Sequence, residues 1–155
     1  MRVALYQPDI PQNTGTILRL AACLGVAVDI IGPTGFDMSD RALRRAGLDY
    51  LDHVDVVRHE SFETFIAAHR ASGPRLVLLT SRGTTPYVDF TFQLDDTLLL
   101  GRESAGVPEH VHAAARHRLK IPMRPGLRSL NIAVAAAMVI GEALRQTGQL
   151  KMNSV

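Results

Sequence analysis

Four short segments of the chain hold the side chains whose types and spacing could support chemistry. Each follows an apolar run typical of a β-strand, and loops at the carboxyl ends of parallel strands are where open α/β sheets bind ligands. Glycines there permit close backbone approach to a ligand. The segments are 7–19, with Asn13 and Arg19; 80–86, beginning with Thr80; 101–108, with Gly101, Glu103 and Gly106; and 121–131, with Met123, Ser129, Leu130 and Asn131.

Several common catalytic patterns do not match these segments. The glycine fingerprint of dinucleotide-binding folds is missing after the first strand, and no phosphate-binding Walker A pattern occurs. The run from Gly101 to Gly106 differs by one residue from a hydrolase nucleophile elbow. His110, His112 and His117 are spaced so that they do not share one helical face, and no cysteine or acid completes a zinc set. We therefore expect neither a hydrolase nor a metal site.

Six short apolar runs predict the strands that position these segments. Several runs are continuously apolar rather than alternating, which is typical of strands covered on both faces in a parallel sheet. Helical patterns lie between them, and this alternation predicts an α/β sandwich. The predicted strands span residues 3–6, 26–31, 54–57, 76–79, 97–100 and 119–121.

The predicted helices begin at polar or proline residues, which favour helix starts. Most of them end before a glycine, which favours helix ends. Asn13 is expected to cap the first helix and Ser129 the last. The predicted helices run from Asn13 to Leu24 before Gly25, from Ser39 to Ala46 before Gly47, from Ser61 to the stop at Gly73, from Pro108 onward, and from about Ser129 to Gln146 before Gly148.

The composition of the 155 residues suits one globular domain, with 46% hydrophobic and 21% charged residues. A formal net charge of +2 neither requires nor excludes an RNA partner. No signal peptide is recognised and no apolar stretch approaches the ~20 residues of a membrane span, so we expect a cytoplasmic protein without membrane contact. Cys23, the single cysteine, is expected to be buried and unpaired. Residues 1–150 are expected to form the domain, and 151–155 a loose tail.

Three of the four segments, in this order and at these distances, resemble the motifs of the SpoU branch of the SPOUT methyltransferases. Asn13–Arg19 resembles the first motif, and Leu98–Pro108 the second. Ile121–Asn131, with the helix that follows it to Gln146, resembles the third. The resemblance covers the whole chain and implies an RNA 2′-O-methyltransferase.

A subgroup of that family is also indicated. The short chain and the segments Pro8–Gly15 and Arg44–Tyr50 resemble the minimal YibK/TrmL type, which methylates the wobble cytidine or uridine of tRNA. Ala133–Val134 and Gly141 depart from that subgroup and resemble other SpoU enzymes, so ribosomal RNA or another tRNA position remains an alternative. A Rossmann- or flavodoxin-type oxidoreductase and a non-catalytic RNA-binding dimer are more distant alternatives.

The resemblance also implies a fold and an assembly. The family fold is a single-domain α/β sandwich with a parallel sheet, whose C-terminal segment is threaded into a deep trefoil knot. Family members are homodimers in which RNA-facing residues of one subunit complete the site of the other. The residues agree with a dimer, because the helix from Ile132 to Ala143 is apolar over most of its circumference.

The resemblance implies S-adenosyl-L-methionine as the methyl donor and S-adenosyl-L-homocysteine as the product, without a metal. Arg19 matches the catalytic arginine of the family. The polar active-site set matches Asn13, Glu103, Ser129 and Asn131. The cofactor-binding positions match Leu79, Thr80, Gly101, Glu103, Gly106, Ile121, Met123, Ser129 and Leu130.

Methyl transfer to a ribose requires alignment of the hydroxyl with the activated methyl group and loss of a poorly acidic proton. Arg19 is an awkward base because a guanidinium stays protonated. We therefore expect Arg19 to stabilise the developing alkoxide while the proton passes to a phosphate or water, with direct abstraction by Arg19 as the family-level alternative. Glu103 is expected to orient Asn13 or an arginine.

Overall fold

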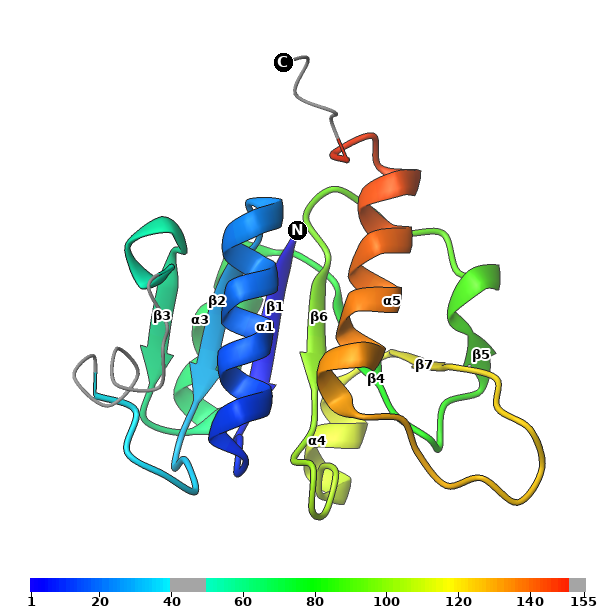
Figure 1. Cartoon of the computed structure of the whole chain (residues 1–155), viewed down its shortest axis with the longest axis horizontal. Helices are drawn as coiled ribbons and strands as arrows, with labels where there is room; N and C mark the ends of the chain where they lie inside the picture. Colours follow the sequence, from blue (N-terminus) through cyan, green and yellow to red (C-terminus); the bar gives the residue numbers. More distant parts are fainter. Residues whose placement is uncertain (40–49, 151–155) are drawn as a thin grey trace.

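The computed structural model describes residues 1–39 and 50–150, in which strands and helices alternate (Figure 1). The strands are β1 (Arg2–Tyr6), β2 (Ala27–Ile31), β3 (Val56–His59), β4 (Leu76–Leu79), β5 (Thr85–Pro86), β6 (Thr97–Leu100) and β7 (His117–Lys120). The helices are α1 (Pro11–Leu24), α3 (Phe62–Ser72), α4 (Glu109–Ala114) and α5 (Ile132–Gln146), with short 3-10 turns η1 (Leu51–His53) and η2 (Tyr87–Asp89).

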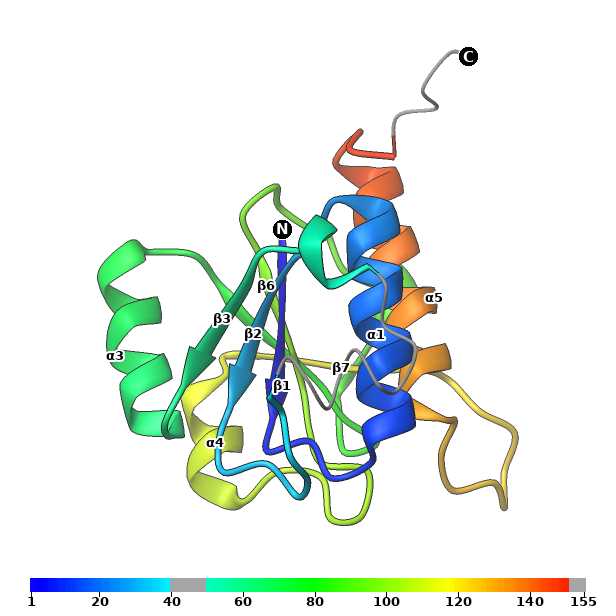
Figure 2. The same cartoon turned by 60° about the vertical axis from the view of Figure 1, so that its left-hand side comes forward.

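The strands form one parallel sheet in the order β3-β2-β1-β6-β4-β7-β5. In its centre, Leu5 lies opposite Leu100, and Leu100 lies opposite Leu79. Figures 1 and 2 show α1 and α5 on one face of this sheet and α3 and α4 on the other. The predicted α/β sandwich with a parallel sheet is thus confirmed.

The two faces of the sheet have separate apolar cores. Along β1, Val3 and Leu5 belong to the core beneath α1 and α5, whereas Ala4 and Tyr6 belong to the core beneath α3 and α4. Successive side chains of a strand point to opposite faces, so a strand that is apolar at every position contributes to both cores. This explains the continuous apolar runs in the sequence.

Two predicted helix starts are wrong. The first helix begins at Pro11 after Ile10, because proline fits the first helical position, and Asn13 lies inside the helix. The last helix begins at Ile132, with Asn131 rather than Ser129 as its cap. Predictions at Ser61 and Gly25 are confirmed: Ser61 forms a capping box with Thr64, and Gly25 ends α1 with a φ of 67°.

Other sequence-based expectations differ from the structure in detail. Strands β3 and β7 begin two residues away from their predicted starts, and the short β5 was not predicted. Cys23 is exposed rather than buried. The helix predicted from Ser39 to Ala46, the arginines in it and the tail 151–155 lie outside the described residues.

Within residues 1–39 and 50–150, none of the helices has the length and apolar character needed to cross a membrane.

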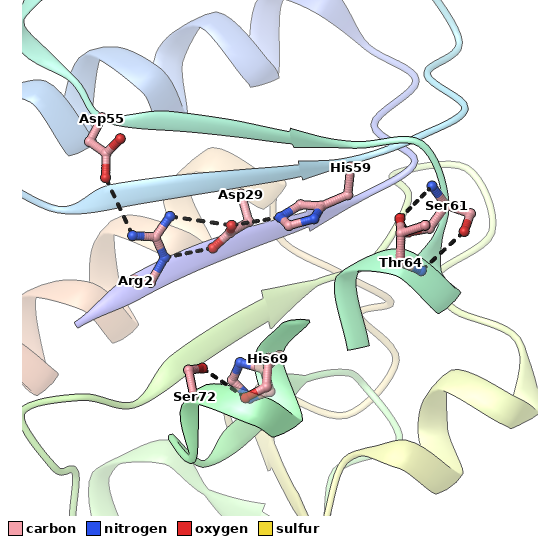
Figure 3. Close-up of polar contacts among 8 residues, drawn as sticks. All are labelled: Arg2, Asp29, Asp55, His59, Ser61, Thr64, His69 and Ser72. Carbon is pink, nitrogen blue, oxygen red and sulfur yellow. Dashed lines mark hydrogen bonds and ion pairs between the residues drawn. The ribbon is translucent and has the colours of Figure 1, made fainter. Parts of the chain in front are cut away.

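An ionic network centred on the buried Asp29 joins β1, β2 and β3 (Figure 3). Asp29 on β2 accepts a hydrogen bond of 2.8 Å from Arg2 Nε, and its other oxygen lies 2.8 Å from His59 Nε2. Arg2 also donates to Asp55 at 3.4 Å. The Asp29 carboxylate is 8% exposed, so these partners replace the water that it loses on burial.

The last strand, β7, lies between β4 and β5 rather than at an edge of the sheet. The segment that follows β4 passes directly over it: Thr80 N donates to Leu119 O at 2.9 Å, and Thr84 N donates to Arg118 O at 3.2 Å. A Cβ atom at Gly83 would stand 2.3 Å from Leu119 O. The crossing therefore leaves no room for any side chain at position 83.

Gly83→Ala is expected to lower the free energy of unfolding by about 1–3 kcal/mol, because the added methyl group overlaps the β7 backbone. Gly141→Ala is the matched control, since a Cβ atom at this position in the middle of α5 would meet no heavy atom within 4 Å beyond its own helix backbone. That substitution should raise helix stability by about 0.5–1 kcal/mol. Urea unfolding at one fixed protein concentration measures both, and equal stability of Gly83→Ala and the parent would contradict the close crossing.

Candidate active site

A cavity of about 450 Å³ opens at the carboxyl ends of the central strands, where the loops after β4, β6 and β7 meet the first turns of α1 and α5. Its volume falls within the range of about 300–1,000 Å³ typical of small-molecule sites. The lining residues are Ile10, Asn13, Leu78, Leu79, Thr80, Ser81, Leu100, Gly101, Arg102, Glu103, Gly106, Val107, Ile121, Met123, Ser129, Leu130, Asn131, Ile132 and Ala135.

The structure brings the predicted site residues together in this cavity, with one exception. All nine predicted cofactor-binding positions line it: Leu79, Thr80, Gly101, Glu103, Gly106, Ile121, Met123, Ser129 and Leu130. Asn13 and Asn131 of the predicted catalytic set line it as well, whereas Arg19 is not among the lining residues.

The loop after β6 forms a tight turn that shapes one wall of the cavity. Arg102 N donates to Gly106 O at 3.0 Å, and Gly106 N donates to Arg102 O at 2.9 Å. Gly106 has a φ of 65°, a conformation that glycine adopts without the steric cost of a Cβ. A Cβ at Gly101 would stand 2.8 Å from the Gly106 carbonyl carbon. Both glycines are therefore required by this turn.

Asn131 joins the first turns of α5 and α1. Its Oδ1 caps α5 by accepting hydrogen bonds from Ala133 N at 2.9 Å and Val134 N at 3.3 Å. Its Nδ2 donates to Asn13 Oδ1 at 2.9 Å. One side chain thus satisfies a helix start and fixes the relative position of two predicted catalytic residues that are 118 positions apart.

Glu103 contacts Asp9, a residue that the sequence analysis missed. Glu103 N donates to Asp9 Oδ1 at 3.2 Å, and Asp9 N donates to Glu103 Oε2 at 3.4 Å. Within residues 1–39 and 50–150, the hydrogen bonds of Glu103 join it to Asp9, and the expectation that Glu103 orients Asn13 or an arginine stays a prediction. Asp9 lies within the first segment, but only the folded chain places it against residue 103.

These contacts shift the pKa values of both acids in opposite directions. The hydrogen bond with the Glu103 carboxyl group, assisted by the Ser104 hydroxyl, lowers the pKa of Asp9 to about 2. Burial, followed by the contact with Asp9, raises the pKa of Glu103. The contact therefore makes Asp9 the stronger acid of the two.

Arg19 is exposed on α1 and faces Tyr50. Its guanidinium carbon lies 4.7 Å from the centre of the Tyr50 ring, and Nη2 donates to the Tyr50 hydroxyl at 3.4 Å. This stacking gives the guanidinium a defined position outside the cavity of its own chain. Arg124 and Arg128, in the loop before α5, are exposed as well.

The three histidines considered as metal ligands occupy different surroundings. His110 packs edge-on against Phe62, His117 packs against Phe90, and His112 is buried. Within residues 1–39 and 50–150, no group of three histidine, cysteine or acidic side chains is arranged to hold a metal ion.

The sequence of the chain matches a known family along most of its length. A family model described as the SpoU rRNA Methylase family matches residues 1–141. The chain belongs to the SpoU methylase family. The glycine turn at 101–106 and the apolar wall formed by Leu79, Leu100 and Ile121 fit the methyl donor of that family, because adenine needs an apolar slot and close backbone approach.

Individual SpoU methylases resemble the chain closely. The tRNA (cytidine(34)-2′-O)-methyltransferase of Beijerinckia indica is 65% identical over 148 residues, which cover 96% of this chain and 92% of that protein. A solved structure, described as giving insights into the 2-OH methylation of C/U34 on tRNA, is 46% identical, with a TM-score of 0.86 and 94% of each chain covered. The AdoMet-bound rRNA methyltransferase of Sinorhizobium meliloti is 30% identical, with a TM-score of 0.84, and the match covers 93% of this chain and 55% of that chain.

Substitution of the two asparagines separates helix capping from the bridge between helices. Asn131→Ala should lower the free energy of unfolding by about 1 kcal/mol, because α5 loses its cap. Asn13→Ala removes the same bridge but keeps the cap, so its stability should stay within about 0.5 kcal/mol of the parent. Urea unfolding of both variants measures the difference, and equal losses would show that the bridge, not the cap, provides the stability.

Proposed function

We propose that this chain transfers the methyl group of S-adenosyl-L-methionine to the ribose 2′-hydroxyl of the wobble cytidine or uridine, position 34, of tRNA. The observation that carries the proposal is the near full-length match to a tRNA (cytidine(34)-2′-O)-methyltransferase, in a chain whose three motif segments meet at one cavity. An rRNA substrate, as in more distant SpoU relatives, is an outcome that the experiment below distinguishes.

The cofactor would lie in the cavity, with its adenosine between the apolar wall and the loops after β6 and β7. Leu79, Gly101 and Ile121 stand at the ends or margins of strands, where backbone groups can recognise a base and a ribose. When bound, the cofactor supplies a methyl group that its sulfonium charge already activates. The chain then has to orient the ribose oxygen and assist the loss of its proton.

Arg19 is proposed to assist that proton loss. As a guanidinium it remains charged and donates hydrogen bonds, so it stabilises the oxygen as negative charge develops, while the proton passes to a phosphate or water. Asn13, Ser129 and Asn131 are proposed to orient the ribose. Since Arg19 lies outside the cavity of its own chain, the Arg19 that serves a given cavity would come from a second copy.

A homodimer is supported by exposed apolar side chains on one side of α5. Val134 and Met138 lie four residues apart on this helix and are 51% and 38% exposed. Residues four apart share one side of a helix, and large apolar side chains aligned in this way are typical of an interface. Pairing through this side would bring α1, which packs beside α5, close to the second copy.

Four further proposals follow from family membership. We infer that the C-terminal segment forms the trefoil knot of the family, supported by the insertion of β7 between β4 and β5 and by its close crossing at Gly83. Residues 1–150 would form the methyltransferase domain, with 151–155 as a tail. The protein would act in the cytoplasm, where its tRNA substrate is found, and without a metal.

The substrate is tested by incubating the purified protein and S-adenosyl-L-methionine separately with unmodified tRNA and rRNA. We expect 2′-O-methylcytidine or 2′-O-methyluridine at tRNA position 34, located by nucleoside and fragment mass spectrometry. Gly101→Trp fills the cofactor cavity and should abolish both methylation and calorimetric binding of S-adenosyl-L-homocysteine. Methylation of rRNA alone would replace tRNA as the substrate, and binding of NAD or FMN instead would overturn the enzyme class.

The role of Arg19 and the dimer are tested together by mixing subunits. Arg19→Ala should lose methyl transfer but still bind cofactor, and Arg19→Lys should recover little because an ammonium lacks the planar fork of donors. Heterodimers isolated after co-expression of Arg19→Ala with Gly101→Trp should have about half of the activity of a wild-type dimer, since only one of the two equivalent sites is intact. Light scattering should give about twice the 16.9 kDa chain mass. Heterodimers that form but remain inactive would mean that each chain builds its site alone.

A further inference from the structure

The basic residues of the chain are concentrated in one segment. Residues 110–141 contain five of the 17 lysine and arginine residues and none of the 15 aspartate and glutamate residues. The rest of the chain is therefore acidic, with twelve basic residues against 15 acids. A local excess of one charge, in a chain whose net charge is small, indicates a surface that meets an oppositely charged partner.

Three of these five residues follow one another at every second position along β7. Arg116 directly precedes the strand, and Arg118 and Lys120 lie within it. Arg118 lies opposite Leu78, which is buried in the core beneath α3 and α4. Leu119 is buried in the core on the other face of the sheet. Because successive side chains of a strand alternate between the faces, Arg118 and Lys120 both point to the face of α3 and α4.

Arg116, Arg118 and Lys120 form a cationic stripe at the surface. Arg116 and Arg118 are exposed, and Lys120 is half-buried. Residues two apart on a strand are separated by about 6.6 Å, so the stripe is roughly 13 Å long. Within residues 1–39 and 50–150, these three side chains form no ion pair with a carboxylate. Glu109, at the start of the neighbouring helix α4, pairs instead with Arg82 at 3.1 Å.

The cationic stripe leads to the cavity and lies away from the proposed dimer surface. Figures 1 and 2 show α1 and α5 on the opposite face of the sheet, so pairing through the exposed side of α5 would leave the stripe uncovered. Lys120 is followed directly by Ile121, which lines the cavity. Arg124 and Arg128, both exposed, lie in the same loop between β7 and α5. Exposed cations thus continue from the stripe into the loop that borders the cavity.

We propose that the cationic stripe binds phosphates of the RNA whose target ribose lies in the cavity. The role rests on the proposed function, but the contact with RNA can be measured without methyl transfer. A nucleic acid strand carries its negative charges at regular intervals, which evenly spaced cations can follow. Arginine suits such contacts because its planar guanidinium donates two parallel hydrogen bonds to a phosphate. Contacts of this kind strengthen and orient the binding of the whole RNA without reading its sequence.

Other anionic partners fit the cationic stripe less well. A surface that binds an anionic membrane combines cations with exposed apolar side chains, whereas Leu119, between Arg118 and Lys120, is fully buried. An acidic protein has no counterpart in the proposed reaction, whereas methyl transfer itself brings the phosphates of an RNA to the end of β7. RNA is therefore the partner that fits both the charge of the stripe and its position beside the cavity.

The test measures binding of unmodified tRNA to the whole protein by fluorescence anisotropy at several salt concentrations. The triple variant Arg116→Gln, Arg118→Gln and Lys120→Gln lacks three phosphate contacts, so its logarithmic dependence of affinity on salt should be shallower by about 2–3. Between about 50 and 200 mM salt, the wild type should therefore lose about 20- to 40-fold more affinity than the variant. At the lower salt concentration, the variant should bind at least about tenfold more weakly.

Single substitutions separate the effect of charge at the stripe from other effects. Arg118→Glu should weaken tRNA binding more than Arg118→Gln, because the carboxylate repels phosphate. Arg70→Gln and Arg70→Glu are matched controls, since Arg70 is exposed on α3, which contacts β3 at the other end of the sheet. Both should bind tRNA within about twofold of the wild type because salt screens distant charges. Calorimetric binding of S-adenosyl-L-homocysteine should not change in any variant, since none of these residues lines the cavity.

A triple variant that binds tRNA with the affinity and salt dependence of the wild type overturns the proposal. Arg70 variants that weaken binding as much as the Arg118 variants also overturn it, because the effect would then report the charge of the whole protein. A loss of tRNA binding that occurs only together with a loss of cofactor binding would show a structural role and refute the stripe. Methylation of tRNA by a protein whose binding ignores the stripe would leave the proposed function intact. Binding that depends on the stripe, without any methylation of tRNA, would refute the proposed function and support the stripe.

Discussion

The candidate site depends on the parallel pairing of β1, β6 and β4. Because these strands run in one direction, the loops after their carboxyl ends meet at the same edge of the sheet. The register places Leu5, Leu100 and Leu79 in one row, so the segments that follow them leave the sheet side by side. The side chains of these strands alternate between two apolar cores, so the packing of each core depends on this register.

Two polar contacts fix the relative positions of the loops that surround the cavity. Asn131 joins the first turns of α5 and α1, and Asp9 joins the loops after β1 and β6. Both contacts link the N-terminal part of the chain to its C-terminal part, and both involve backbone N–H groups that would otherwise lack a partner near a partly buried cavity. The same contacts that orient polar side chains also complete the hydrogen bonding of the loops.

Helix α5 has one side buried in the core and another side exposed. Ala136, Val139 and Ile140 are buried in the core that it shares with α1, whereas Val134 and Met138 on another side stay exposed. An Arg19 held against Tyr50 outside its own cavity agrees with this division, since the proposed dimer would carry that arginine to a second cavity. The proposed second copy is therefore supported both by the exposed side of α5 and by the position of Arg19.

The sequence by itself determined the parallel α/β class and the loop segments that form much of the cavity wall, and the family resemblance singled out eleven of the nineteen lining residues. Continuous apolar runs such as Leu98–Leu100 require cover on two faces, and the glycines at 101 and 106 mark a turn that excludes side chains. Only the tertiary structure decided that Asp9 stands behind Glu103, that Asn131 caps α5 and contacts Asn13, and that Arg19 lies outside the cavity. Local patterns specify elements because periodicity and turn chemistry act over a few residues. Contacts between residues about a hundred positions apart depend instead on the order of the strands in the sheet and on how the chain connects them, because these place each loop in space.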